Sequence, residues 1–173
     1  MTMLVAAGVS CTGDPPDTMP GVDLASEAMT VARDINGISD VVQLSDGAIV
    51  FGEVYEDRLV MIAPGSPTQR YIGREGNGPG EFQRIGGLVK VHDDTVAVMD
   101  AMQRRMSLFD RRGRFVRAVP LLAGPDGSVW LDCTFYSDFA GHVYAVPTLD
   151  RSRHRFAFPL DTLPVLRIPI DGS

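Results

Sequence analysis

Residues 72–82 read IGREGNGPGEF, a stretch with four glycines and one proline among eleven residues. Glycine adopts backbone conformations that other residues avoid, while proline fixes φ and lacks a backbone donor. Such a stretch cannot lie inside a helix or a strand. Because strand-like sequence flanks it on both sides, we predict that it connects two structural units.

The units on the two sides of this connector are copies of one another. Residues 44–51 align without a gap with residues 91–98, an offset of 47, and the same offset places Arg58 on Arg105. A further shift of 47 residues reaches a third copy at residues 141–144. A repeat of this length predicts an architecture built from identical small units.

Each copy contains four short apolar segments separated by turn signals, which is typical of strands. Four antiparallel strands at a period of 40–50 residues predict a propeller blade. A twisted sheet of four strands buries both of its faces only when a neighbouring blade covers each of them. The predicted fold class is therefore all-β, a β-propeller of four-stranded antiparallel blades.

The connector at 72–82 resembles the GREGxGPGEF connector of bacterial six-bladed β-propellers related to NHL-repeat proteins, and residues 93–117 are similar to that family's blade. The resemblance covers about residues 38–147. It implies a six-bladed ring, and the family as a whole has no assigned activity that would extend to this chain. About three of the six blades would be present, at approximately residues 38–82, 83–130 and 131–173.

A chain with half of the blades would leave sheet edges and faces open, which favours pairing or aggregation. We therefore expect a truncated member of the family. The alternative is a half-ring that a second copy closes by self-association through the open edges.

The N-terminal residues indicate export. Residues 3–10 are apolar and rich in small side chains, and they precede Cys11 and a polar, turn-rich stretch at 12–17. This resembles the end of a bacterial lipoprotein signal in which Cys11 would be lipidated, although basic residues are missing before the apolar run and Gly8 stands where leucine is usual. We predict a signal-like segment with linker at 1–20, a partial propeller at 21–173, and an extracytoplasmic protein that is lipid-anchored at the cell membrane. The alternative is an ordinary unstructured N-terminus.

Charge and hydropathy argue against nucleic acid binding and against a transmembrane helix. The net charge of −6 argues against nucleic acid, because binding to phosphates needs a concentrated basic face. No apolar run approaches the ~20 residues of a transmembrane helix. Cys133 lies in an apolar segment and is expected to act as a small buried hydrophobe.

The charged residues that recur with the repeat are the candidate site. Glu53 and Arg58 recur as Asp100 and Arg105 with the same spacing. A structural role would explain the repetition, since such an acid either bonds loop amides at the end of its strand or pairs with the arginine five residues on. The candidate ligand-binding residues are Glu53, Tyr55, Asp57, Arg58, Arg74, Asp100, Arg104 and Arg105.

The sequence predicts no catalytic constellation, cofactor or metal. His92, His142 and His154 lack the spacing of metal ligands, and Asp93-Asp94 is a polar turn without the alternation of a calcium loop. The serines lack the sequence context of a nucleophile elbow.

These observations favour a non-enzymatic binding or scaffold module that contacts a protein or a glycan at the cell envelope. The alternative is part of a metal-dependent propeller hydrolase or lyase, similar to the lactonases, with its remaining ligands in missing blades. Stoichiometric divalent metal in a complete version of the protein would favour the enzyme over the binding module.

Overall fold

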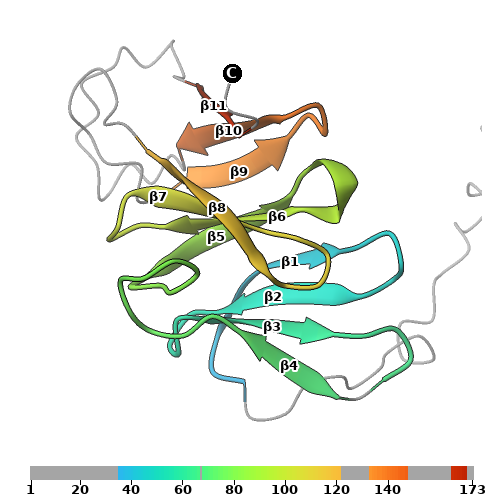
Figure 1. Cartoon of the computed structure of the whole chain (residues 1–173). Helices are drawn as coiled ribbons and strands as arrows, with labels where there is room; N and C mark the ends of the chain where they lie inside the picture. Colours follow the sequence, from blue (N-terminus) through green and yellow to red (C-terminus); the bar gives the residue numbers. More distant parts are fainter. Residues whose placement is uncertain (1–34, 67, 122–132, 148–164, 171–173) are drawn as a thin grey trace, which may run out of the picture. The chain divides into compact units, whose positions relative to one another are not determined.

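The structure is a computed structural model that describes residues 35–66, 68–121, 133–147 and 165–170. Its strands form three antiparallel sheets in which neighbouring strands are also consecutive in the chain (Figure 1). The first sheet contains β1 (Ile38–Gln43), β2 (Ile49–Glu53), β3 (Arg58–Ile62) and β4 (Gln69–Ile72).

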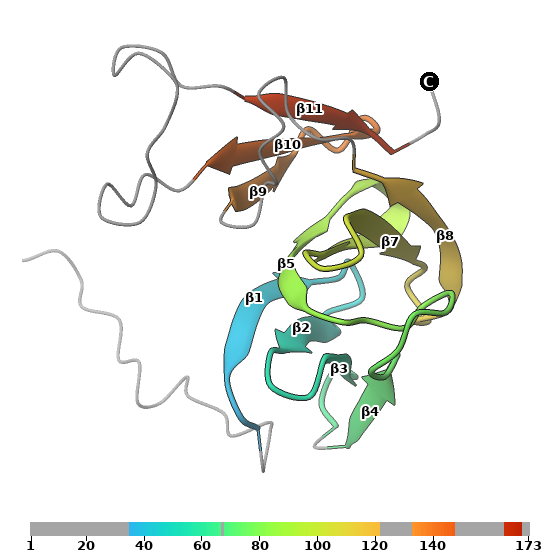
Figure 2. The same ribbon diagram turned by 90° about the vertical axis from the view of Figure 1, so that its left-hand side faces the viewer.

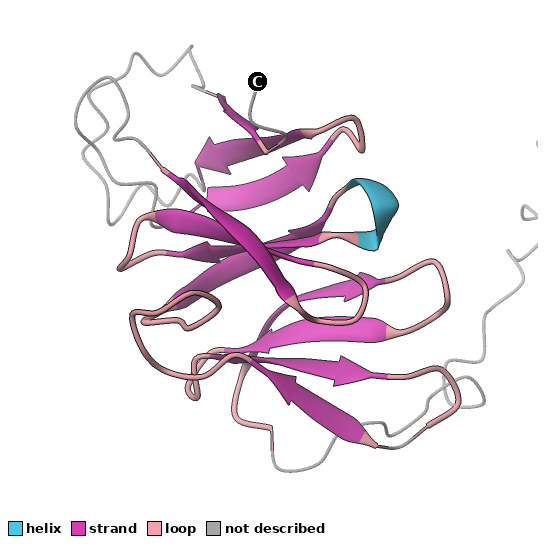
Figure 3. Cartoon of the chain, in the orientation of Figure 1, coloured by secondary structure: helices cyan, strands magenta, loops and turns pink. Residues whose placement is uncertain are grey.

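The second sheet has the same four-stranded meander, and the third has three described strands. The second sheet contains β5 (Ile85–Lys90), β6 (Val96–Asp100), β7 (Arg105–Phe109) and β8 (Phe115–Pro120). The third contains β9 (Cys133–Ser137), β10 (His142–Pro147) and β11 (Leu166–Pro169). Apart from one short 3-10 turn, η1 (His92–Asp94), the regular structure of the described residues is all strand (Figure 3). No helix in this part of the chain is long and apolar enough to cross a membrane.

The strand positions follow the 47-residue offset seen in the sequence. Strands β1, β2 and β3 begin at residues 38, 49 and 58, and β5, β6 and β7 begin at 85, 96 and 105. The first strand of each of these two sheets also has a register shift near its start, after Ile38 in β1 and after Ile85 in β5. The predicted alignment of the first two copies is thereby confirmed, down to this irregularity.

The middle sheet is buried on both faces, because its side chains alternate between two neighbours. On β6, Val96 and Val98 belong to the core shared with the first sheet, which includes Leu59. Ala97 and Met99 belong to the core shared with the third sheet. This alternation with a period of two is the geometry of a strand, and it explains why every residue of β6 is buried.

The first strands of the sheets are the elements that meet. Strand β1 lies beside β5 and β5 beside β9, and Figure 2 shows β1 and β5 as neighbours. Asp40 on β1 accepts the N–H of Leu88 on β5 at 3.0 Å. A Cβ built on Gly87 of β5 would lie 3.2 Å from the ring of Phe135 on β9, so the missing side chain lets β9 approach.

Successive four-stranded meanders that face one another and meet at their first strands are the blades of a propeller. The chain is therefore an all-β protein with a partial β-propeller fold. The predicted segment at 1–20, with Cys11, lies outside the described residues, as do parts of the second and third predicted blades.

Candidate functional site

Glu53 and Arg58 form an ion pair at the hairpin between β2 and β3. Nε of Arg58 donates to Oε2 of Glu53 at 2.7 Å, and Oε1 accepts the N–H of Asn36 at 3.2 Å. The hydrogen bond to Glu53 raises the pKa of Arg58, whose guanidinium also lies 4.0 Å from the centre of the Tyr71 ring. Glu53 is fully buried. Because its carboxylate is engaged within the chain, a partner would contact the surface around it rather than Glu53 itself.

Asp100 occupies the equivalent position in the second sheet and has one bond in common with Glu53, since Gln83 stands 47 residues after Asn36, but its other bonds differ. Its carboxylate accepts three backbone N–H groups, from Gln83 at 2.7 Å, Met102 at 3.0 Å and Gln103 at 2.9 Å. Asp100 is also fully buried. Its side chain is one methylene shorter than that of Glu53, so it bonds the amides of the loop that follows its own strand. Of the two structural roles suggested by the repeat, Glu53 fills one and Asp100 the other.

Arg105 holds the connector against the hairpin between β6 and β7. Its Nη2 donates to the carbonyl oxygens of Gly78 at 2.6 Å and Glu81 at 2.9 Å. Nε2 of Gln103 donates to the carbonyl oxygen of Gly76 at 2.7 Å. The glycine-rich connector is thus fastened by side chains from the next sheet.

Arg74 lies on the outside of the connector with its side chain 80% exposed. Its Nε donates to Oε1 of Glu81 at 2.7 Å, and Oε2 of Glu81 accepts the N–H of Gly78 at 2.8 Å. The Gly78 N–H, and then Arg74, hold the pKa of Glu81 below its usual range. The Glu81 pair orients Arg74 but leaves most of its surface free for contact.

Asp57 and Arg104 occupy equivalent positions just before β3 and β7, where both backbones are left-handed, with φ of 45° and 50°. Oδ1 of Asp57 accepts the N–H of Ile85 at 3.0 Å and so ties the first hairpin to the start of β5. Burial raises the pKa of Asp57, the Ile85 bond lowers it only in part, and the charges of Asp100 and Glu75 raise it further.

Together these contacts assemble the predicted residues at one end of the strands. We call this the loop surface: the exposed side chains of the β2–β3 loop (54–57), the connector (73–84) and the β6–β7 loop (101–104). Tyr55 is 79% exposed and Met102 is 60% exposed. They stand 47 residues apart, so each hairpin presents an exposed apolar side chain at the same position.

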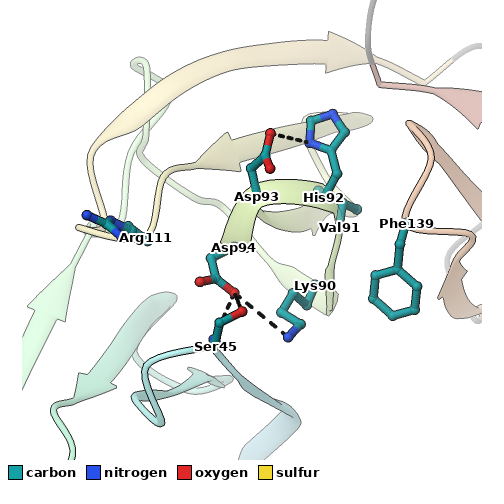
Figure 4. Close-up of a pocket in the computed structure, with 8 residues that line it drawn as sticks. All are labelled: Ser45, Lys90, Val91, His92, Asp93, Asp94, Arg111 and Phe139. Atoms are coloured by element: carbon teal, nitrogen blue, oxygen red, sulfur yellow. Dashed lines mark hydrogen bonds and ion pairs between the residues drawn. The ribbon is translucent and has the colours of Figure 1, made fainter.

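A pocket of about 810 Å³ lies at the opposite end of the strands, beside the β1–β2, β5–β6, β7–β8 and β9–β10 turns (Figure 4). Ser45, His92 and Phe139 line it from three different sheets. They are spaced 47 residues apart and therefore occupy equivalent positions in the repeat. Lys90 and Arg111 add two positive charges to its lining.

Asp94 joins two of the turns at this pocket. Its Oδ1 accepts both the N–H and the hydroxyl of Ser45, each at 2.9 Å, and lies 3.8 Å from Nζ of Lys90. Burial raises the pKa of Asp94, but the two Ser45 bonds and the charges of Lys90 and Arg111 outweigh it, so the net pKa is lowered. Asp93 and Asp94 both have left-handed backbones, with φ of 52° and 55°. Consecutive non-glycine residues in this conformation are uncommon, and such strain gathers at functional sites.

The sequence motifs do not predict this pocket. Sequence motifs consider each residue alone: Ser45 as a nucleophile, His92 as a metal ligand and Asp93–Asp94 as a calcium loop. The other lining residues, Lys90, Arg111 and Phe139, belong to no motif. The signal that could have found it is the repeat itself, since the turn positions at 45, 92 and 139 coincide under the 47-residue offset.

Of the other residues considered in the sequence, His142 and Cys133 lie in the third sheet, and His154 lies outside the described residues. His142 lies in the third sheet, where Nδ1 contacts Oδ2 of Asp138 at 2.7 Å and Nε2 accepts a hydrogen bond from Nη2 of Arg167 at 2.9 Å. Cys133 is half-buried beside the core between the second and third sheets. Among the described residues there is no group of three or more His, Cys, Asp or Glu side chains that could hold a metal ion.

No protein-family model matches the chain, and no curated protein matches it. Solved structures do. A candidate exported protein from Bacteroides fragilis has 14% identity and a TM-score of 0.53, over 66% of this chain and 31% of that one. Streptogramin B lyase has 12% identity and a TM-score of 0.43, over 78% and 41%. Regucalcin, a calcium-binding protein from Agrobacterium tumefaciens, has 14% identity and a TM-score of 0.44, over 69% and 41%.

The chain spans less than half the length of each of these proteins. At this level of identity the similarity concerns the fold alone. The match to the Bacteroides fragilis protein shows that about two thirds of this chain shares its fold with a solved protein.

Proposed function

We propose that this chain is an exported β-propeller module that binds a protein at the cell envelope through its loop surface. The observation that carries the proposal is the recurrence of an exposed apolar side chain, Tyr55 and then Met102, at the same hairpin position in two adjoining sheets. A partner that covers both loop tips would bury these two side chains and remove their apolar surface from water.

The composition and the rigidity of the surface favour a protein partner. Tyrosine, methionine and arginine are enriched in protein interfaces, and Tyr55, Met102, Arg74 and Arg104 supply all three types. The buried carboxylate of Asp100 and its bonds hold one of the loops in place. Binding therefore loses less conformational entropy than it would with loose loops. A glycan is the alternative partner.

The proposed location rests on the N-terminal sequence, with small apolar residues before Cys11. The fold shared with a candidate exported protein agrees with it. We propose that Cys11 carries a lipid that anchors the propeller at the outer side of the cell membrane. Metabolic labelling with an alkyne fatty acid tests this directly, because Cys11→Ala should abolish the label, and a labelled variant would refute the anchor.

Quantitative capture of envelope proteins tests the binding role. The bait is the full chain, and the double variant Tyr55→Ser, Met102→Ser should lose at least about 10-fold in recovery of the specific partner. Val116→Ser on β8 is the matched control, since Val116 is also an exposed apolar residue but lies outside the loop surface. Circular dichroism and thermal unfolding verify that all three proteins are folded.

Equal recovery by wild type and the double variant would refute the loop surface as the binding site. Recovery that survives protease treatment of the envelope and disappears after glycosidase treatment would replace the protein partner with a glycan. The metal-dependent hydrolase or lyase is tested separately by elemental analysis of a complete version of the protein, because its remaining ligands would lie in missing blades. A binding module predicts no stoichiometric divalent metal, and one equivalent would favour the enzyme.

A further inference from the structure

We propose that the pocket at the opposite end of the strands binds a small organic anion, a carboxylate carried on an apolar group. This site is separate from the loop surface and does not depend on the function proposed for it. Its volume of about 810 Å³ falls within the roughly 300–1,000 Å³ of small-molecule sites.

Three nitrogen-bearing side chains of the pocket have hydrogen-bonding groups without a hydrogen-bond partner among the described residues. Nζ of Lys90 lies 3.8 Å from its nearest carboxylate oxygen, too far for a hydrogen bond, and Nδ1 of His92 lies 3.9 Å from Asp93. Within the described part of the chain, the Arg111 guanidinium makes no hydrogen bond or ion pair, although its charge acts on Asp94. Three such side chains thus line one pocket from three elements (Figure 4).

The acidic side chains of the pocket lie near these groups but accept no hydrogen bond from them. Oδ1 of Asp94 already accepts two hydrogen bonds from Ser45. The Asp93 side chain is 96% exposed, so water solvates its carboxylate. Lys90 and Arg111 can therefore donate hydrogen bonds to an acceptor-rich anion. A lysine or an arginine that donates to a carboxylate forms a charge-assisted bond, which is stronger than a neutral one.

Phe139 supplies the apolar part of the site. Its ring belongs to a residue that is 62% exposed, on a turn where φ is 57°. The turn is held in this conformation by the N–H of Phe139, which donates to Oγ of Ser137 at 3.0 Å. A held turn that presents an exposed aromatic ring beside positive charges suits a ligand with an apolar group next to its carboxylate.

Titration with phenylacetate and its neutral counterpart phenylacetamide tests the proposal, using the full chain and two-dimensional NMR. We expect phenylacetate to shift the amide resonances of residues 45, 90–94, 111 and 139 and to bind at least about 10-fold more tightly than phenylacetamide, since a charged pair contributes a factor of this size. Arg111→Gln and Lys90→Gln should each weaken phenylacetate about 10-fold and leave phenylacetamide unchanged. Phe139→Ser should weaken both probes.

Arg84→Gln is the matched control, because Arg84 is an exposed arginine of the connector at the other end of the strands. It should leave both affinities unchanged. Equal affinity for the two probes, shifts confined to other residues, or unchanged binding in folded Arg111→Gln and Lys90→Gln would overturn the proposal. Partner capture by Arg111→Gln should equal that of wild type, so the two sites are judged independently.

Discussion

Asp100 has no exposed surface, and its two carboxylate oxygens accept three backbone N–H groups. Asp100→Asn would place an amide NH₂ where one of these N–H groups now donates. A buried donor left without its acceptor costs roughly 1–3 kcal/mol, so we expect a loss of about 2 kcal/mol in the free energy of unfolding. Urea denaturation measures it.

The control for this prediction is Asp93→Asn. The Asp93 side chain is 96% exposed, and asparagine tolerates its left-handed backbone, so the change should stay within about 0.5 kcal/mol. Equal effects of the two substitutions would mean that the Asp100 bonds do not stabilise the hairpin.

Asp138 is expected to make the stability of the fold depend on pH in the acidic range. The N–H of Ala140 is the largest of the influences that lower its pKa, to about 2, and the contact with His142 lowers it as well. A carboxyl group whose pKa is lower in the folded state stabilises the fold above its unfolded pKa, about 3.8, and this contribution is lost as the pH falls through about 2.

Wild type should therefore be more stable than Asp138→Asn at pH 5, and the difference should shrink between about pH 4 and pH 2. Unfolding midpoints in urea, measured at each pH, follow it. A difference that stays constant over this range would show that the charge of Asp138 does not contribute.

At the scale of elements, the connector depends on a glycine whose backbone and surroundings both exclude a side chain. Gly73 has φ of 73°, and a Cβ there would lie 2.6 Å from the Phe82 ring and 2.7 Å from the Gly80 carbonyl oxygen. Phe82 is fully buried in the core between the first two sheets, so it cannot move away without opening that core. We expect Gly73→Ala to destabilise the fold by about 3 kcal/mol or more, from left-handed strain and overpacking together.

Gly65→Ala separates these two contributions. Gly65 has φ of 66°, but a Cβ added there would meet no atom within 4 Å, so this change introduces only the strain of about 1–2 kcal/mol. Chemical denaturation of both variants tests the difference. Equal losses would show that contact with Phe82 is unimportant.

At the scale of the whole molecule, Phe135 couples the third sheet to the second. It belongs to the core that joins Met99 and Met106 of the second sheet to Val143 and Ile168 of the third. Phe135→Ala removes a large side chain from this core, which typically costs about 3–5 kcal/mol. Because each sheet is held by its neighbours, we expect the loss to concentrate in β9–β11.

Hydrogen exchange measures this distribution. In Phe135→Ala the amides of β9–β11 should exchange faster by a larger factor than those of β1–β4. Tyr136→Ala is the control, since Tyr136 is the next residue on the same strand and is exposed. A uniform acceleration over all three sheets would indicate one cooperative unit instead.

The fold class and most strand positions could be read from the sequence, because they depend on local patterns. Alternating apolar residues specify strands, glycine-rich turns end them, and the 47-residue offset locates β5 from β1. The exposed tips at Tyr55 and Met102 follow from the same offset, and Tyr55 could be singled out because it stands in a loop beside two acids.

The sequence by itself determined that this chain is a series of four-stranded units and that certain charges repeat with them. Only the tertiary structure decided what each charge does. Glu53 reaches Arg58, while Asp100, which is one methylene shorter, bonds the amides of its own loop. The repeat places the two acids at the same position and does not reveal this difference in bonding. The pocket was likewise decided by packing, since Ser45 and Phe139 are far apart in the chain and line one cavity only because the sheets stack.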